Sequence, residues 1–239
     1  MIANRIHRIG TAVAMLLLFA LMTGCAAKNG AISDPWEGYN RAMYSFNEGV
    51  DRAVLKPMAK GYEWLVPVPV NAIITNFFNN IGDAVVAVNN LLQGKIREAG
   101  SDVGRLLLNS SLGMGGLVDV ATGMGFEQHN EDFGQTFARW GIGDGPYFVL
   151  PFLGPSTVRD AFGRAAGWQA DPFTYLNPDA LHYSLVGLRL IDTRADLLPA
   201  EKMVEAGAID RYSYLRDAYL QHRRYQIYDG QPPREEEEE

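Results

Sequence analysis

The sequence predicts a mainly α-helical protein with short extended segments, and three observations support this prediction. Apolar residues recur every three or four positions over several long stretches, as they do along one face of an amphipathic helix. The pair Asp34-Pro35, an N-cap followed by proline in the first turn, is typical of a helix start. Residues 142–155, which contain three prolines, favour extended chain or turns, so the non-helical segments are short.

The expected elements follow from these signals. In the first half they are a helix over 34–56 that Pro57 ends or kinks, a proline-spaced linker at 66–70, a helix over 71–94 that stops at Gly94, a helix from about Ile96 to Asn109, and a segment at 110–126 with five glycines. In the second half they are a short helix from Glu131 to Trp140, extended chain at 142–155, a brief helix capped by Ser156 and running through Arg164, a helix opened by Pro178 and reaching Ile191, and a final helix from about Ile209 to Tyr228.

The N-terminus has the layout of a lipoprotein signal peptide. Arg5 and Arg8 precede an uncharged stretch of 14 residues, which suits a secretory leader but is shorter than the ~20 residues of a spanning helix. The stretch leads into Met22-Thr23-Gly24-Cys25, which fits a lipobox except that Met stands in place of the usual Leu. We expect cleavage before Cys25 and acylation of that residue by three chains; the alternative is a small buried thiol.

This reading divides the chain into a signal peptide (1–24), a lipidated linker (25–33), one helical domain (34–228) and a disordered acidic tail (229–239) that ends in five glutamates. Two or more acyl chains hold a protein stably on a membrane. Because Ala26, and not Asp, follows Cys25, the common Gram-negative sorting rule favours the outer membrane.

Charge is distributed unevenly along the chain. Residues 71–94, 106–126 and 140–158 each contain one acid and no base. These central stretches are therefore either deeply buried or in contact with lipid. Still, no segment reaches ~18 consecutive apolar residues, so we expect no membrane-spanning helix.

The composition excludes several functions. Removal of residues 1–24, which contain two arginines and no acid, changes the net charge from −7 to −9, unsuited to nucleic acid. Cys25 is the only cysteine, so an internal disulfide is impossible. The glycine runs match no phosphate loop, and His129, His182 and His222 lack metal-ligand spacing. Gly154-Pro155-Ser156-Thr157-Val158 has Val where a nucleophile elbow needs Gly. We expect no enzyme activity, no cofactor and no metal.

Several long motifs resemble those of one known family. They are Asp34-Pro35-Trp36-Glu37-Gly38-Tyr39-Asn40-Arg41, Asn109-Ser110-Ser111-Leu112-Gly113-Met114-Gly115-Gly116-Leu117-Val118-Asp119-Val120-Ala121, Asp132-Phe133-Gly134-Gln135-Thr136, Gly143-Asp144-Gly145-Pro146-Tyr147, Leu150-Pro151-Phe152-Leu153-Gly154-Pro155-Ser156 and Arg159-Asp160. From about Asp34 to Tyr225, their order and spacing resemble the outer-membrane lipoproteins of the pathway that maintains lipid asymmetry (MlaA, also called VacJ).

The resemblance implies a ring of amphipathic helices that lie in the membrane plane, embedded in the inner leaflet of the outer membrane, around a channel. Such proteins remove mislocalised phospholipid from the outer leaflet and pass it to a soluble periplasmic lipid-carrier protein. That carrier supplies an inner-membrane ABC transporter. The resemblance also implies association with an outer-membrane trimeric porin.

Within this family we expect the passage to be built by residues 71–94 and 110–126. Neutral polar groups accept a lipid head group at lower desolvation cost than charged ones. The candidate lipid-channel residues are Asn79, Asp83, Asn90, Gly113, Gly115, Gly116 and Asp119. The alternatives are solvated amides on the helix, a tight turn at each glycine and a helix cap at Asp119.

Two other functions remain open. A structural, porin-associated envelope lipoprotein would have the same anchor but no transport activity. A periplasmic phospholipase would need a nucleophile that the sequence does not offer.

Overall fold

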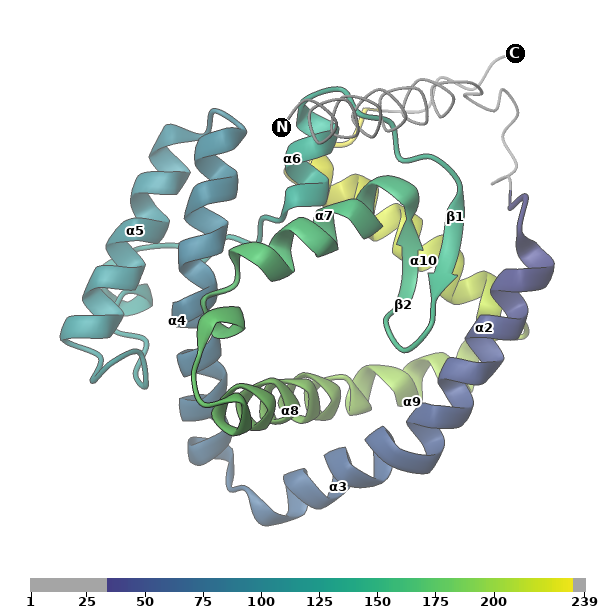
Figure 1. The fold of residues 1–239 in the computed structure, drawn as a ribbon, viewed down its shortest axis with the longest axis horizontal. Coiled ribbons are helices and arrows are strands. Elements are labelled where there is room, and N and C mark those ends of the chain that lie inside the picture. The colour runs from purple at the N-terminus through teal and green to yellow at the C-terminus, as the bar shows by residue number, and fades with distance from the viewer. Residues whose placement is uncertain (1–33, 234–239) are drawn as a thin grey trace, which may run out of the picture.

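Helices joined by short turns make up most of residues 34–233, the part of the chain that the computed structural model describes (Figure 1). In chain order the elements are α2 (Glu37–Val50), a π-helical turn (Asp51–Leu55), α3 (Lys56–Leu65), α4 (Val68–Leu92), α5 (Ile96–Ser111), a 3₁₀ turn (Thr122–Met124), α6 (Phe133–Arg139), β1 (Tyr147–Leu150), β2 (Gly154–Thr157), α7 (Val158–Ala170), a second 3₁₀ turn (Pro172–Tyr175), α8 (Asp179–Asp196), α9 (Leu198–Gly207) and α10 (Arg211–Ile227). The mainly α prediction is confirmed. The signal peptide, Cys25 and the linker lie outside the described residues.

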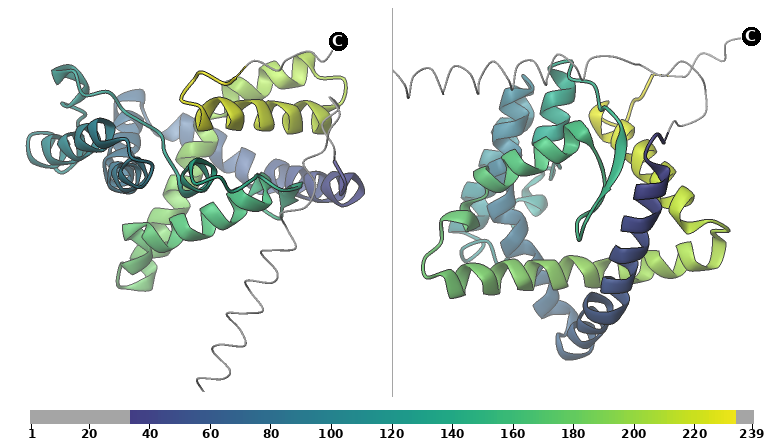
Figure 2. Two further views of the ribbon diagram at one scale, coloured as in Figure 1. Left: turned by 90° about the horizontal axis from the view of Figure 1, so that it is seen from above. Right: turned by 45° about the vertical axis from the view of Figure 1, so that its right-hand side comes forward.

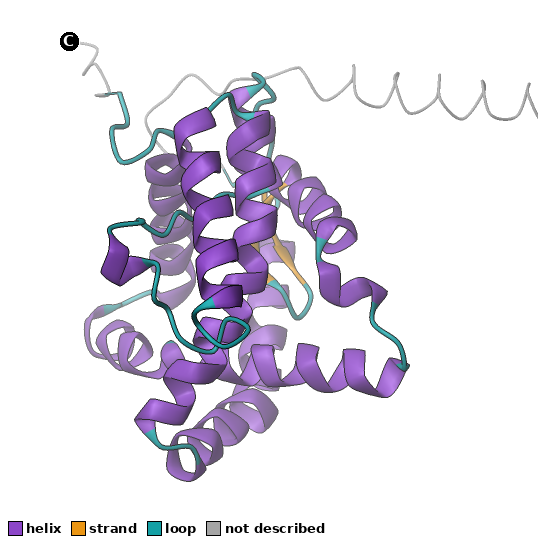
Figure 3. Ribbon diagram, turned by 90° about the vertical axis from the view of Figure 1, so that its left-hand side faces the viewer, coloured by secondary structure: helices purple, strands orange, loops and turns teal. Residues whose placement is uncertain are grey.

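The helices are arranged as an open ring. In Figure 1, α4, α7, α8 and the β1–β2 hairpin border the opening, while α2 lies outside the hairpin and α3 on the far side of α8. The opening is still visible after the 45° turn in Figure 2. The α5 helix lies beside α4 on the outside of the ring, as Figure 3 shows from that side. Within the described residues, no helix combines the length and the hydropathy that a bilayer crossing requires.

Pro57 does not end the first helix. The chain continues from α2 through the π-helical turn, in which the Lys56 N–H bonds to the carbonyl of Asp51, five residues back. Pro57, which has no N–H to donate, falls in the first turn of α3, where none is needed. The expected single helix is therefore replaced by two, and Figure 1 shows the ribbon bending between them.

The proline-spaced linker is shorter than predicted. Only Val66 and Pro67 lie outside helices, because Val68 begins α4 and Pro69 occupies its first turn. The other end of α4 agrees with the sequence, since Gly94 follows it with a φ of +81°.

The second half differs from the prediction in its boundaries. The extended segment at 142–155 is a hairpin in which β1 and β2 pair antiparallel, with Tyr147 opposite Thr157. Ser156 belongs to β2, and the N-cap of α7 is instead Thr157, whose hydroxyl accepts from the Asp160 N–H. The α7 helix then continues to Ala170, and α9 was not predicted.

The first residues of the predicted disordered tail are packed against the domain. Asp229 forms an ion pair with Lys95, and Arg224 donates to the carbonyl of Pro233 at 2.9 Å. The glutamate run lies outside the described residues.

Charged side chains occupy the junction of α6, α7 and α10. Asp160, buried on α7, accepts from Arg159 at 2.9 Å, from Arg223 at 3.0 Å and from Tyr219 at 2.8 Å. Arg223 also holds Asp132, the N-cap of α6, at 2.6 Å. Burial alone would raise the pKa of Asp160, but the two arginines outweigh it and hold that pKa below its usual value. One ion-pair network thus joins three helices.

We expect Asp160→Asn to lower the free energy of unfolding by about 3 kcal/mol at pH 7, because it removes the counter-charge of buried Arg159 and leaves buried Arg223 with Asp132 alone. A carboxylate with a lowered pKa contributes stability above its unfolded pKa of about 4 and loses that contribution as pH falls further. The deficit should therefore shrink at pH 3. Urea unfolding at both pH values measures it, with the exposed Asp179→Asn as control; an equal deficit at both would contradict the assignment.

Candidate functional site

The candidate lipid-channel residues all lie on α4 and on the glycine-rich segment that follows α5. At their centre is Arg105 of α5, which is 1% exposed. Its guanidinium contacts Asp83 of α4 at 3.3 Å, Asp119 of the segment at 3.0 Å and the carbonyl of Phe126 at 2.8 Å. Arg105 therefore ties both helices to the loop.

The two acids that share Arg105 differ in their ionisation. Burial raises the pKa of Asp83 to about 6, in opposition to the attraction of Arg105. Burial acts in the same direction on Asp119, but hydrogen bonds from the side chain and backbone of Thr122, from Arg105 and from Asn109 lower its pKa to about 2. Asp119 therefore remains ionised to a lower pH than Asp83.

Asn109 closes the loop onto α5. Its side-chain oxygen accepts from the backbone N–H groups of Val120 and Ala121 at 2.9 and 3.0 Å, and its amide donates to Asp119 at 3.1 Å. Sequence reasoning missed both Arg105 and Asn109. One signal in the sequence could have indicated them. Asp83 and Asp119 are isolated acids in nearly uncharged stretches, and a buried acid needs a hydrogen-bond donor from elsewhere in the chain.

The remaining polar candidates are placed separately. Asn90 is fully buried and donates to Asp102 at 2.7 Å, and Asp102 in turn contacts the Nδ1 of His129 at 2.7 Å. Asn79 is exposed, whereas its neighbour Asn80 is buried and donates to Ser110 at 2.9 Å. The structure thus joins Asp83 and Asp119 through one arginine and leaves Asn79 and Asn90 outside that cluster.

The glycines shape a tight turn. A Cβ at Gly113 would lie 2.1 Å from the carbonyl oxygen of Val118, which no side chain can tolerate. Gly116 has a φ of +89°, and a Cβ there would lie 2.4 Å from the Asn80 amide. Gly115 has a φ of +76° but open space around it. The turn accounts for all three glycines.

This cluster lies on the outer side of the ring. In Figure 1 the loop after α5 is separated from the opening by α4. The described contacts give Asp83, Asn90, Gly113, Gly116 and Asp119 a packing role, and their contact with lipid stays a prediction.

A second feature is an apolar surface over a polar interior. Among the described residues, buried polar or charged side chains outnumber buried apolar ones, while large apolar side chains are exposed on most helices. The turn between α3 and α4 is the clearest case, with Trp64 and Val68 each 84% exposed and Leu65 68% exposed. Exposed large apolar side chains grouped on one turn are typical of a surface that contacts a membrane or a partner.

Comparison with known proteins identifies the family. The family model described as MlaA lipoprotein matches residues 32–226. The chain belongs to the MlaA lipoprotein family. The resemblance found in the motifs is thereby confirmed over nearly all of the described residues.

Its relatives include named members of this family. The intermembrane phospholipid transport system lipoprotein MlaA of Escherichia coli K12 is 37% identical over 220 residues, which cover 87% of this chain and 85% of the relative. The Haemophilus influenzae protein of the same name is 29% identical and covers 92% of this chain and 91% of its own length. A solved structure, described as the structural basis for maintenance of bacterial outer membrane lipid asymmetry, is 33% identical with a TM-score of 0.72 and covers 83% of this chain and all of its own.

Because their pKa values are shifted in opposite directions, Asp83 and Asp119 should affect the free energy of unfolding in opposite ways as pH falls. Since the pKa of Asp83 is raised, its contribution to stability should increase by about 1 kcal/mol as pH falls from 7 to about 5, because Asp83 takes up a proton more readily in the folded state. Since the pKa of Asp119 is lowered, its contribution is present above about pH 4 and lost towards pH 2. Asp83→Asn should remove the first change and Asp119→Asn the second, as measured by urea unfolding across pH. Identical profiles for the two variants would refute the assignment.

Gly113→Ala should destabilise the chain by ~1–3 kcal/mol, because the new Cβ would overlap the Val118 carbonyl. Gly123→Ala is the matched control in the same segment, since its Cβ would meet open space at an ordinary φ. Thermal unfolding of both variants measures the difference. Equal melting temperatures would show that the loop relaxes around the added methyl group.

Proposed function

We propose that this protein is an outer-membrane lipoprotein that removes mislocalised phospholipid from the outer leaflet and passes it to a soluble periplasmic lipid carrier. The observation that carries the proposal is the exposed apolar surface around a paired, polar interior. It is supported by membership of the MlaA family and by the names of the E. coli and H. influenzae relatives.

The anchor in this proposal is Cys25. Its acyl chains hold the protein on the periplasmic face of the outer membrane, where the ring is embedded in the inner leaflet. A trimeric porin is the proposed neighbour, and an inner-membrane ABC transporter receives the lipid from the carrier. The protein is proposed to act without catalysis.

Burial of the exposed apolar side chains in the bilayer would supply the free energy that embeds the ring in the inner leaflet. Full burial of a large apolar side chain contributes about 1.5–3 kcal/mol, so Trp64, Leu65 and Val68 together favour the bilayer by several kcal/mol. Trp64 also suits the interface between head groups and tails, where tryptophan is enriched in membrane proteins.

Transfer of labelled phospholipid from donor vesicles to a purified periplasmic carrier tests the function. We expect the wild-type chain to speed transfer, and the double variant Trp64→Asp/Val68→Asp to bind vesicles and transfer lipid at least about tenfold less, since each charge placed in hydrocarbon costs about 2.5 kcal/mol or more. The control variant Asn130→Asp/Gln231→Asp adds the same charge at exposed polar positions.

Two results would overturn the proposal. Vesicle binding without any transfer would favour the structural, porin-associated alternative. Release of free fatty acid during incubation with phospholipid would show hydrolysis and favour a phospholipase.

A further inference from the structure

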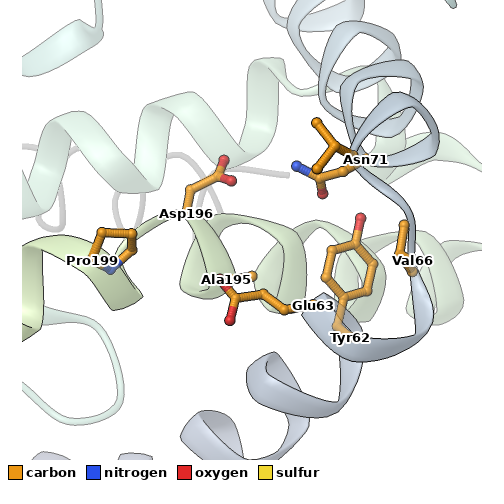
Figure 4. A pocket seen from close by; sticks show the side chains of 8 residues that line it. Tyr62, Glu63, Val66, Asn71, Ala195, Asp196 and Pro199 are labelled. Atoms are coloured by element: carbon orange, nitrogen blue, oxygen red, sulfur yellow. The ribbon is translucent and has the colours of Figure 1, made fainter.

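A cleft of about 390 Å³ lies where α3 and the start of α4 meet the junction of α8 and α9. Glu63 of α3, Asn71 of α4 and Asp196 of α8 supply its polar lining, and Figure 4 shows their side chains around the same space beside the Tyr62 ring. Neither lysine nor arginine is among the described residues that line the cleft. The charged residues of its lining are therefore all acidic, which favours a negative electrostatic potential.

A buried acid behind the cleft adds to this potential. Asp192 is 3% exposed, and its hydrogen-bond donors among the described residues are the hydroxyl groups of Tyr62 at 2.8 Å and of Thr75 at 3.2 Å. The other buried aspartates of residues 34–233 each contact a basic side chain; they are Asp83, Asp102 and Asp160. Buried charges are ordinarily paired, so this site has an excess of negative charge.

The lining also contains one buried acceptor that lacks a donor. The side-chain oxygen of Asn71 is buried and has no hydrogen-bond partner. Glu63 and Asp196 are exposed and form no ion pair with a described residue, although the Asn71 side chain hydrogen-bonds Asp196. Burial and the neighbouring Asp192 raise the pKa of Asp196, as expected where no cation balances the carboxylates.

We propose that this cleft binds the primary ammonium group of an ethanolamine-type phospholipid head group. An –NH₃⁺ group has three donors and no acceptor, which matches the Asn71 oxygen and the Glu63 and Asp196 carboxylates. The inference rests on the proposed function and adds a head-group preference to it.

A lipid is favoured over a lysine of a protein partner by the surroundings of the cleft. Val68 is both part of its lining and 84% exposed, and Trp64 and Leu65 lie on the same turn. These side chains place the mouth of the cleft at the level of lipid head groups once the turn enters the bilayer.

The chemistry of the lining predicts which lipids are rejected. A phosphatidylglycerol head group carries no ammonium, and the carboxylates repel its phosphate. A choline head group is cationic but has no N–H to donate to Asn71. We therefore expect phosphatidylethanolamine to bind best.

The test uses the full chain in detergent, equilibrated with vesicles of phosphatidylethanolamine, phosphatidylcholine and phosphatidylglycerol in equal parts with identical acyl chains. The lipid that copurifies is quantified by mass spectrometry. We expect wild type to enrich phosphatidylethanolamine over phosphatidylglycerol by at least about fivefold. Glu63→Gln/Asp196→Asn should abolish the enrichment, Asn71→Ala should reduce it, and the exposed pair Glu127→Gln/Asp179→Asn should leave it unchanged.

The outcomes separate this inference from the proposed function. Wild type that binds all three lipids equally would refute the head-group inference alone, and wild type that binds no lipid would refute the proposed function as well. Enrichment that survives in Glu63→Gln/Asp196→Asn would move the preference to another part of the chain. Unchanged lipid binding with lost binding of a protein partner would assign the cleft to a lysine of that partner and overturn the proposal.

Discussion

The fold depends on buried ion pairs at its helix junctions. Arg105 holds α4, α5 and the glycine-rich segment together, and Arg223 holds α6, α7 and α10. A protein that presents its large apolar side chains outward has few left for a core, so charged groups must supply specific contacts between helices. Because a buried pair that loses one partner costs far more than the intact pair contributes, these junctions are also where the fold is most easily broken.

Close backbone contact is the second constraint, and it follows from the first. A short salt-bridge network requires helices that approach closely, and small residues allow this. A Cβ at Gly163 of α7 would lie 2.4 Å from the backbone nitrogen of Gly134 in α6, directly beside the Asp160 network. Gly113 has the same function in the glycine-rich turn beside Arg105.

The sequence predicted the positions of the helices more successfully than the side-chain contacts between them. Apolar periodicity gave α4, α5 and α10 to within a few residues, because this signal is local. Asp34 was wrong as the N-cap of α2: that position is Trp36, which forms no side-chain cap bond, and Asp34 instead accepts from Asn40. Of the two effects expected of Pro57, the chain shows a bend and not an end, and the π-helical turn at this bend has no simple sequence signature. The candidate residues Asp83 and Asp119 were recognised as unusual, but their partner Arg105 was not, since pairing across 22 and 14 residues depends on the packing of two helices and a loop.

Buried acids are ordinarily paired with bases, and by this rule the α3–α8 junction differs from the other helix junctions in its charge balance. Where helices meet only each other, as at Arg105 and Arg223, the acids are balanced within the chain. At Asp192 the donors are hydroxyls, which satisfy the hydrogen bonds of a carboxylate but not its charge. Where every buried acid is paired with a base, an added cation meets no excess negative charge. At the α3–α8 junction the acids exceed the bases, and the site lies beside a cleft and an exposed apolar turn, so an external cation would be bound most favourably there.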